Sequence, residues 1–364
     1  MRFKTTTYIL VTAVVALLTM PARVLAQPAA KTHRNSITAF DVPGTGVQTI
    51  PIAINLGGLI AGYDLDENAV FHGFIRTPGG HITTFDAPGA GTTPFNGTLG
   101  TAINLVGVVT GQVCGDDTVC HGFIRTPGGH FTTFDAPGAV GFTTGAAINL
   151  FGQVAGYYQD GSLVAHSFLR AANGTFTIID VPGAGTGPNE GTWMFYINTM
   201  TLDGSVSGFY VDADGLGHGW IRKGNGTIIT FDAPGAGTDG SQGQGTYPIT
   251  INELGEVGGG YVDAANIEHG FIRAADGTFT TVDVPGASNS GVDTLNDLGV
   301  AAGEFLDQTY TYHCFFRTPD GTITTVDVPG AENTREGGIN DLGVITGFFA
   351  ENGLLHGYVR YPHP

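Results

Sequence analysis

The chain is short of basic residues, and this shortage excludes two classes of partner. Only 14 of its 364 residues are Lys or Arg, against 32 Asp and Glu. Without Arg2, Lys4 and Arg23 near the start, 11 basic residues remain and the net charge is −21. Nucleic acids and anionic lipid surfaces are bound through basic patches, so we expect neither as a partner. The charge suits neutral glycans, cationic partners or divalent cations, although solubility alone also accounts for it.

Long apolar runs are also missing, which argues against a membrane span in the mature chain. The run Ile9 to Met20 has 12 residues, whereas a spanning helix needs about 20. Basic residues precede this run and the small-residue site Val24-Leu25-Ala26 follows it, as in a cleaved export signal. We therefore predict cleavage after Ala26 and a bacterial protein that is periplasmic or secreted. The predicted organisation is a signal peptide over 1–26, a short linker over 27–35 and a single domain over 36–364.

Cysteine is scarce, with three residues in the whole chain. Cys114 and Cys120 flank a turn and lie close enough to close a hairpin disulfide in an oxidising compartment. Two free thiols are the alternative. Cys314 follows a repeated His and is interpreted as a buried small apolar residue.

The familiar signatures of enzymes and metal sites are absent. The chain has no Gly-x-Ser-x-Gly, no His-Glu-x-x-His and no phosphate-binding loop. It also lacks the twelve-residue calcium loop of EF-hands, although its oxygen-rich turns leave calcium open as an alternative. We predict no cofactor, no metal and no catalytic residue on these grounds.

One phrase is abundant: His-Gly-Phe-Ile-Arg, a turn, and Thr-Thr-Phe-Asp-Ala-Pro-Gly recur along the chain. A repeat of about 40–50 residues, rich in strands and turns, is typical of β-propellers. The repeated His residues are His72, His121, His166, His218, His269, His313 and His356. The repeated Asp residues are Asp41, Asp86, Asp135, Asp180, Asp232, Asp283 and Asp327.

Each repeat predicts a blade of four short strands. Asn-Gly and Asp-Gly between the third and fourth strands predict a two-residue turn, which would place Phe74 opposite Phe85. Apolar residues on both sides of the third strand predict burial between neighbouring blades. The segment 36–41 reads as a fourth strand without a third, and 356–360 as a third without a fourth. We therefore predict an all-β, seven-bladed propeller of four-stranded blades, closed by pairing between its two ends.

The repeated His and Asp residues are interpreted as structural, because a catalytic residue is needed once and a packing residue in every blade. An Asp such as Asp66 precedes the His by six residues in most repeats and is placed to orient its ring. The repeated Asp is expected to accept hydrogen bonds from the turn that follows it. The repeated Arg residues, Arg76 to Arg360, are expected to lie along the blade and pair with carboxylates. Repeated ligand sites, one in each blade, are the alternative.

Residues that interrupt the repeat are the better candidates for function. His and the following Asp are always 14 residues apart, whereas the segments that join one repeat to the next vary in length. Such variable segments lie on one face of a propeller and are commonly its recognition surface. Aromatic, carboxylate and cationic side chains there suit a sugar-binding face, although the aromatic ones also suit loop packing. The binding candidates are Phe95, Phe142, Glu190, Trp193, Tyr196, Tyr247, Arg335 and Glu336.

The last repeat resembles a known family. Ile-Asn-Asp-Leu-Gly-Val-Ile-Thr-Gly followed by His-Gly-Tyr-Val-Arg, within 339–360, is similar to the bacterial extracellular HAF repeats, with Gly for the family's Ala and Arg for its closing Trp. The resemblance extends over 36–360 and implies an exported, propeller-like protein. It implies no activity and no catalytic residues.

Two hypotheses of function follow. The first is a monomeric, exported, non-enzymatic propeller that binds a glycan or an envelope or extracellular protein through its variable inter-blade loops. The alternative is a secreted lyase or glycoside hydrolase that cleaves polysaccharides on the same face. An enzyme would need acid, base and cation in one place, and Glu190, Arg335 and Glu336 are the residues to examine.

Overall fold

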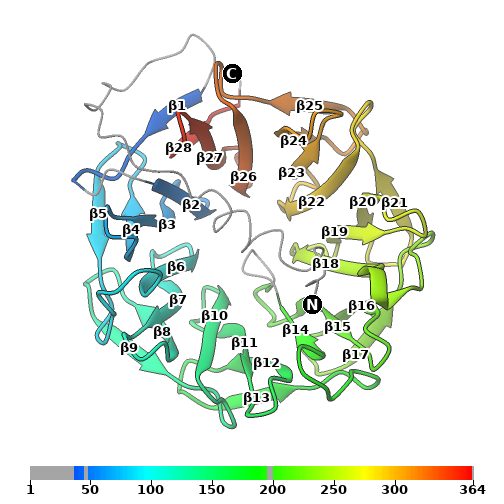
Figure 1. Cartoon of the computed structure of the whole chain (residues 1–364), viewed down its shortest axis with the longest axis horizontal. Helices are drawn as coiled ribbons and strands as arrows, with labels where there is room; N and C mark the ends of the chain where they lie inside the picture. The colour runs from blue at the N-terminus through cyan, green and yellow to red at the C-terminus, as the bar shows by residue number, and fades with distance from the viewer. Residues whose placement is uncertain (1–36, 45–47, 195–199, 363–364) are drawn as a thin grey trace.

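The computed structural model describes residues 37–44, 48–194 and 200–362, and this part is almost entirely β-strand. Antiparallel strands form four-stranded blades around a common centre (Figure 1). The only helical element of the described part is a 3₁₀ turn over Gly240–Gln242. The predicted signal peptide and linker fall in 1–36 and lie outside the described residues. No helix of the described chain is long and apolar enough to cross a membrane.

The blades are given from the innermost strand outward. They are β2 (Gln48–Ile54), β3 (Ile60–Leu65), β4 (Phe71–Arg76) and β5 (Ile82–Phe85); β6 (Gly97–Ile103), β7 (Val109–Cys114), β8 (Cys120–Arg125) and β9 (Phe131–Phe134); β10 (Phe142–Ile148), β11 (Val154–Gln159), β12 (Ala165–Arg170) and β13 (Phe176–Ile179); β14 (Gly191–Trp193), β15 (Val206–Val211), β16 (Gly217–Arg222) and β17 (Ile228–Phe231); β18 (Gly245–Ile251), β19 (Val257–Val262), β20 (Glu268–Arg273) and β21 (Phe279–Val282); β22 (Asn289–Leu295), β23 (Ala301–Leu306), β24 (Tyr312–Arg317) and β25 (Ile323–Val326); and β26 (Asn333–Ile339), β27 (Ile345–Glu351) and β28 (Leu354–Arg360).

The two ends of the described chain meet in one blade. β1 (Ile37–Phe40) pairs antiparallel with β28, with Ile37 opposite Arg360 and Phe40 opposite Gly357. β1 therefore lies outside β28 as the fourth strand of the last blade (Figure 1). This is the pairing that the incomplete repeats at the two ends of the sequence predict.

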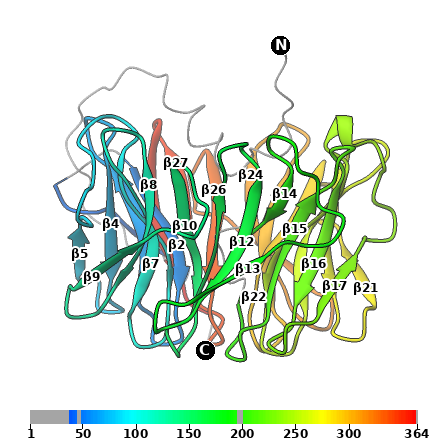
Figure 2. The ribbon, with the colours of Figure 1, turned by 90° about the horizontal axis from the view of Figure 1, so that it is seen from below.

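Strands run between two faces of the molecule, which Figure 2 shows edge-on. One face carries the segments that join consecutive blades, together with the hairpins between second and third strands; we call it the linker face. Backbone hydrogen bonds join the two kinds of loop, as from Phe95 N to Ala69 O at 2.7 Å. The opposite face carries the remaining hairpins, between first and second and between third and fourth strands; we call it the turn face.

The apolar core lies between neighbouring blades, as the two-sided apolar pattern predicts. Phe85 at the end of β5 packs edge-on against Phe123 of the next blade, with ring centroids 6.2 Å apart. Arg125 of that blade places its guanidinium 4.7 Å from the Phe85 ring. Its Nη1 donates to the Thr126 carbonyl rather than to a carboxylate. The prediction that the repeated arginines pair with carboxylates is therefore wrong, because the phenylalanine faces attract them instead.

The turn between third and fourth strands has one residue more than predicted. Gly80 N donates to Thr77 O at 2.9 Å, and Gly80 has a φ of +87°. This is a type I turn followed by a left-handed glycine, a common three-residue hairpin. The extra residue shifts the register by one position, so Phe85 lies opposite Gly73. The predicted pairing of Phe74 with Phe85 is wrong for this reason.

Candidate functional site

The repeated His and Asp side chains form one contact in each blade. The shifted register brings His72 beside Asp86, and its Nδ1 lies 2.8 Å from Asp86 Oδ1. The same contact measures between 2.6 and 3.0 Å in the other blades, including His356 with Asp41 across the two ends. The repeated Asp thus accepts from histidine, whereas the sequence predicted donors in the following turn.

A second carboxylate and an aromatic ring hold most of these histidines from other sides. His218 Nε2 lies 3.3 Å from Asp212 Oδ2, six residues earlier, and the ring stacks on Tyr210 at 4.8 Å. The hydrogen bond with Asp232, opposed by burial, raises the pKa of His218. Both ring nitrogens are engaged in this way, so the geometry accords with the structural interpretation of the repeated histidines.

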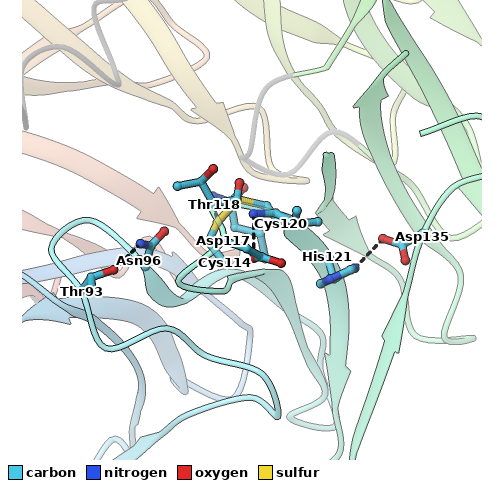
Figure 3. The surroundings of a disulfide bond; sticks show 10 residues. Thr93, Asn96, Cys114, Asp117, Thr118, Cys120, His121 and Asp135 are labelled. Carbon is cyan, nitrogen blue, oxygen red and sulfur yellow. Dashed lines mark hydrogen bonds and ion pairs between the residues drawn. A yellow bond between two sulfur atoms is a disulfide. The ribbon is translucent and has the colours of Figure 1, made fainter. Parts of the chain in front are cut away.

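Figure 3 shows the hairpin of the linker face that the disulfide closes. Cys114 ends β7 and Cys120 begins β8, and the two are paired across the strands with a Cα–Cα distance of 4.0 Å. His121 follows directly and contacts Asp135 in the same view. The expected pairing is thus present beside the repeated His–Asp contact.

The predicted loop residues differ in how much they offer to a ligand. Phe95 is 49% exposed on the linker face and has a φ of +65°. Glu190 uses its carboxylate within its own loop, where Oε2 accepts from Gly187 N at 2.6 Å. Tyr196 lies outside the described residues.

Three predicted aromatic residues belong to innermost strands rather than to loops. Phe142, Trp193 and Tyr247 lie in β10, β14 and β18. Tyr157 and Phe209 join them into one chain of rings, with successive centroids 5.3, 5.4, 6.2 and 5.4 Å apart. Burial raises the pKa of Tyr247 to about 12, and its hydroxyl donates to the Gly243 carbonyl. These contacts accord with packing, the alternative reading of the aromatic residues.

A charged cluster replaces the aromatic chain on the other side of the centre. Arg335 Nε in β26 lies 2.6 Å from Glu304 Oε2 in β23, and its guanidinium lies 3.8 Å from the Tyr312 ring. Glu336 N donates to Glu304 Oε1 at 3.0 Å, and Thr294 Oγ1 donates to Glu336 Oε1 at 2.7 Å. These contacts thus link four strands, β22, β23, β24 and β26, of two neighbouring blades.

More carboxyl groups lie in this cluster than its arginine can neutralise. Asp293 and Glu336 are 8% and 5% exposed, and Asp293 Oδ2 and Glu336 Oε2 have no hydrogen-bond partner in the described part of the chain. Burial and the charge of Glu304 raise the pKa of Asp293 well above its usual value. Burial and the charge of Asp293 do the same for Glu336. Burial, with Glu304 second, raises the pKa of Glu268 to about 7.

Two members of this cluster were predicted from the sequence and three were not. Arg335 and Glu336 were singled out, whereas Glu268, Asp293 and Glu304 were not. The missed signal is a break of the repeat inside strands: Glu304 aligns with Tyr63, Gln112, Tyr157, Phe209, Gly260 and Phe348. Glu190 does not join the cluster, because it precedes β14 while Arg335 and Glu336 lie in β26, well apart around the centre (Figure 1).

The described residues contain no group of three or more His, Cys, Asp or Glu arranged to hold a metal ion. The charged cluster offers an arginine, several carboxyl groups held toward their neutral form, and a threonine hydroxyl.

No family model and no curated protein matches the chain. Solved structures resemble it over most of its length. A virginiamycin B lyase from Staphylococcus aureus has a TM-score of 0.59 at 15% identity, covering 90% of this chain and 99% of that chain. The β-propeller domain of the Trilobed protease from Pyrococcus furiosus has 0.55 at 8%, covering 87% and 99%. A lectin from Burkholderia pseudomallei has 0.53 at 11%, covering 86% and 96%. At these identities the likeness establishes the architecture alone: the chain has the β-propeller fold.

Proposed function

We propose that this protein is an exported, seven-bladed propeller, closed by β1 against β28, that binds a glycan or an extracellular or envelope partner through its linker face. The pairing of β1 with β28 supports closure, and the disulfide supports export, because disulfides persist in oxidising compartments. A lectin among the similar propellers makes a glycan the first ligand to test. The resemblance to HAF repeats agrees with this proposal and remains a prediction.

One observation carries the proposal: bulky side chains are held exposed and strained on the linker face. Phe95, Leu163 and Tyr310 are 49%, 52% and 79% exposed, with φ of +65°, +61° and +62°. A left-handed conformation costs a residue with a side chain about 1–2 kcal/mol, and such strain concentrates at ligand-binding loops. Loops that only connect strands would carry Gly or Asn at these positions.

The test is a glycan array, with binding to immobilised cell-envelope fractions as its second arm. The double variant Phe95→Asn with Tyr310→Asn keeps residues that tolerate positive φ while removing the apolar side chains. We expect it to lose binding that the wild type shows. Phe151→Ser, on the turn face, is the matched control and should retain binding. Failure of the wild type in both arms, or equal binding by the double variant, would contradict the proposal.

The charged cluster supports a second candidate, a polysaccharide-cleaving enzyme. Asp293, Glu336 and Arg335 supply carboxyl groups and a cation in one place, as general acid–base cleavage requires. A lyase assay by absorbance of the unsaturated product and a reducing-sugar assay, over a panel of polysaccharides, test it. Cleavage that disappears in Asp293→Asn but not in Asp214→Asn, an exposed linker-face change, would favour the enzyme over the binder.

A further inference from the structure

The turn face has a belt of asparagines around its centre. The side-chain amide of Asn55 donates to the Asn104 carbonyl of the next blade at 2.8 Å. The same bond repeats at 3.0 to 3.4 Å from Asn104, Asn149, Asn252, Asn296 and Asn340, with Thr201 in the place of an asparagine in the β14–β17 blade. Because the belt runs around the centre, the residue that follows each of its members lies beside the centre on the turn face. We call this ring of seven residues the mouth.

The residues at this mouth divide into an apolar and an acidic side. Four consecutive blades carry Leu after the belt position, and the next three carry carboxylates: Leu56, Leu105, Leu150 and Leu202, then Glu253, Asp297 and Asp341. The carboxylates stand in a row, because Glu253 Oε1 accepts from Leu202 N, Asp297 Oδ1 from Glu253 N and Asp341 Oδ1 from Asp297 N, at 2.7 to 2.8 Å.

A cavity of about 170 Å³ opens at the acidic side of the mouth. Leu56, Glu253, Asp297 and Asp341 lie in its wall, and no Lys or Arg does. The space is far larger than one water requires and would accept the head group of an amine or guanidinium. Burial and the charges of Asp297, Asp203 and Asp341 raise the pKa of Glu253, so a cation in the cavity would relieve an existing repulsion.

Exposed apolar side chains are concentrated in the turns between first and second strands, which carry the residues of the mouth. Nine of the fifteen most exposed large hydrophobic residues of the described chain lie in these turns: Leu56, Leu105, Val106, Leu150, Phe151, Leu202, Leu254, Leu298 and Leu342. Phe151, Leu298 and Leu342 are more than 60% exposed. Contiguous apolar surface rimmed by polar groups marks interaction sites, whereas turns need polar residues only.

From this juxtaposition we propose that the mouth on the turn face binds a polypeptide segment whose Lys or Arg enters the cavity while its flanking apolar side chains rest on the leucines. The three carboxylates of the mouth favour an occupant that carries positive charge. A second copy of this chain would bring the same acids into an isologous contact. An anionic membrane is repelled by the three carboxylates and by the net charge of −18. This site is separate from the linker face and holds whether or not that face binds a glycan.

The experiment is panning of a random heptapeptide phage library on the mature protein and on the variant E253Q/D297N/D341N. The amide side chains keep the accepting oxygens that bond the neighbouring backbone, so the fold is retained. We expect enriched peptides with a Lys or Arg between apolar residues. A labelled synthetic copy should bind the variant at least about tenfold more weakly by fluorescence anisotropy, and bind the wild type more weakly at high salt.

A control variant and a variant of the apolar side of the mouth complete the experiment. The triple variant E67Q/D117N/D214N changes the net charge equally on the linker face and should bind the peptide as the wild type does. Leu298→Ser with Phe151→Ser should weaken binding without changing its salt dependence. Enrichment without basic residues, no enrichment, or equal affinity for E253Q/D297N/D341N would overturn the proposal. So would a dimer in analytical ultracentrifugation that Leu298→Ser with Phe151→Ser dissociates, since the face would then be a self-association surface.

Discussion

Asp293 and Glu336 are residues whose ionisation the surrounding fold opposes. A carboxyl group with a raised pKa in the folded state holds a proton that the unfolded chain releases, between the two pKa values. For Glu268 this interval runs from 4.5 to about 7, and Asp293 and Glu336 shift in the same direction. These groups therefore make their full contribution to the free energy of unfolding at a pH below their pKa in the unfolded chain. The contribution decreases as the pH rises from there to their pKa in the folded protein.

We expect Asp293→Asn with Glu336→Gln to stabilise the protein at pH 8 by roughly 1 to 3 kcal/mol, because neutral amides avoid burying charge. At pH 4.5 the difference should be small. Thermal unfolding from pH 4.5 to 8 measures both, and the variant should show the flatter profile. Asp214→Asn, at an exposed carboxylate, should follow the wild type. A variant less stable than the wild type at pH 8 would show that ionised carboxylates at these positions stabilise the fold.

Single residues also show what sequence alone could not supply. Asn55 begins a turn, with Gly58 N donating to its carbonyl, as its position shortly before a Gly-Gly pair suggests. Its second role, the bond from its side chain to the next blade, depends on a neighbour 49 residues away. Glu304 breaks the repeat in the sequence, but only the folded chain places it and Asp293 beside Glu268 and Glu336 of the neighbouring blades.

At the scale of the strand pair, the type of turn decides which side chains meet. Asn-Gly and Asp-Gly correctly predicted a hairpin between third and fourth strands. The loop length was wrong by one residue, because a two-residue turn and a type I turn with a left-handed glycine share this composition. Because the extra turn residue shifts the register, His72 contacts Asp86 and the expected pairing of Phe74 with Phe85 does not form.

Gly80 and Gly79 offer a matched test of this turn. Gly80 has a φ of +87° with only Arg76 Nη2 near the position of an added Cβ, at 3.7 Å, so Gly80→Ala would strain the backbone without a steric clash. We expect a loss of about 1–2 kcal/mol in the free energy of unfolding. Gly79→Ala, one residue earlier and outside the positive-φ region, should cost much less. Urea unfolding of both variants distinguishes them, and equal losses would argue against a left-handed residue at position 80.

At the scale of the whole molecule, the proposed closure depends on how firmly β1 is bound to the last blade. Phe40 in β1 occupies the place that Phe85 has in β5. Its ring lies 6.2 Å from the Phe74 ring, and the Arg76 guanidinium lies 4.6 Å from it. His356 adds a bond to Asp41 at 2.7 Å. The contacts at the junction between the chain ends are thus the same as those between two consecutive blades elsewhere in the chain, where Phe85 contacts Phe123 and Arg125.

If β1 closes the propeller, Phe40→Ala should destabilise it about as much as Phe85→Ala, since both remove the same ring from equivalent contacts. The expected loss is about 2 to 4 kcal/mol for each variant in urea unfolding. The comparison is informative because Phe85 is held in place by strands on both sides of it in the sequence, whereas Phe40 precedes the rest of the domain. A cost for Phe40→Ala below about 1 kcal/mol, beside a full cost for Phe85→Ala, would mean that β1 detaches readily and that the remaining strands do not depend on it for stability.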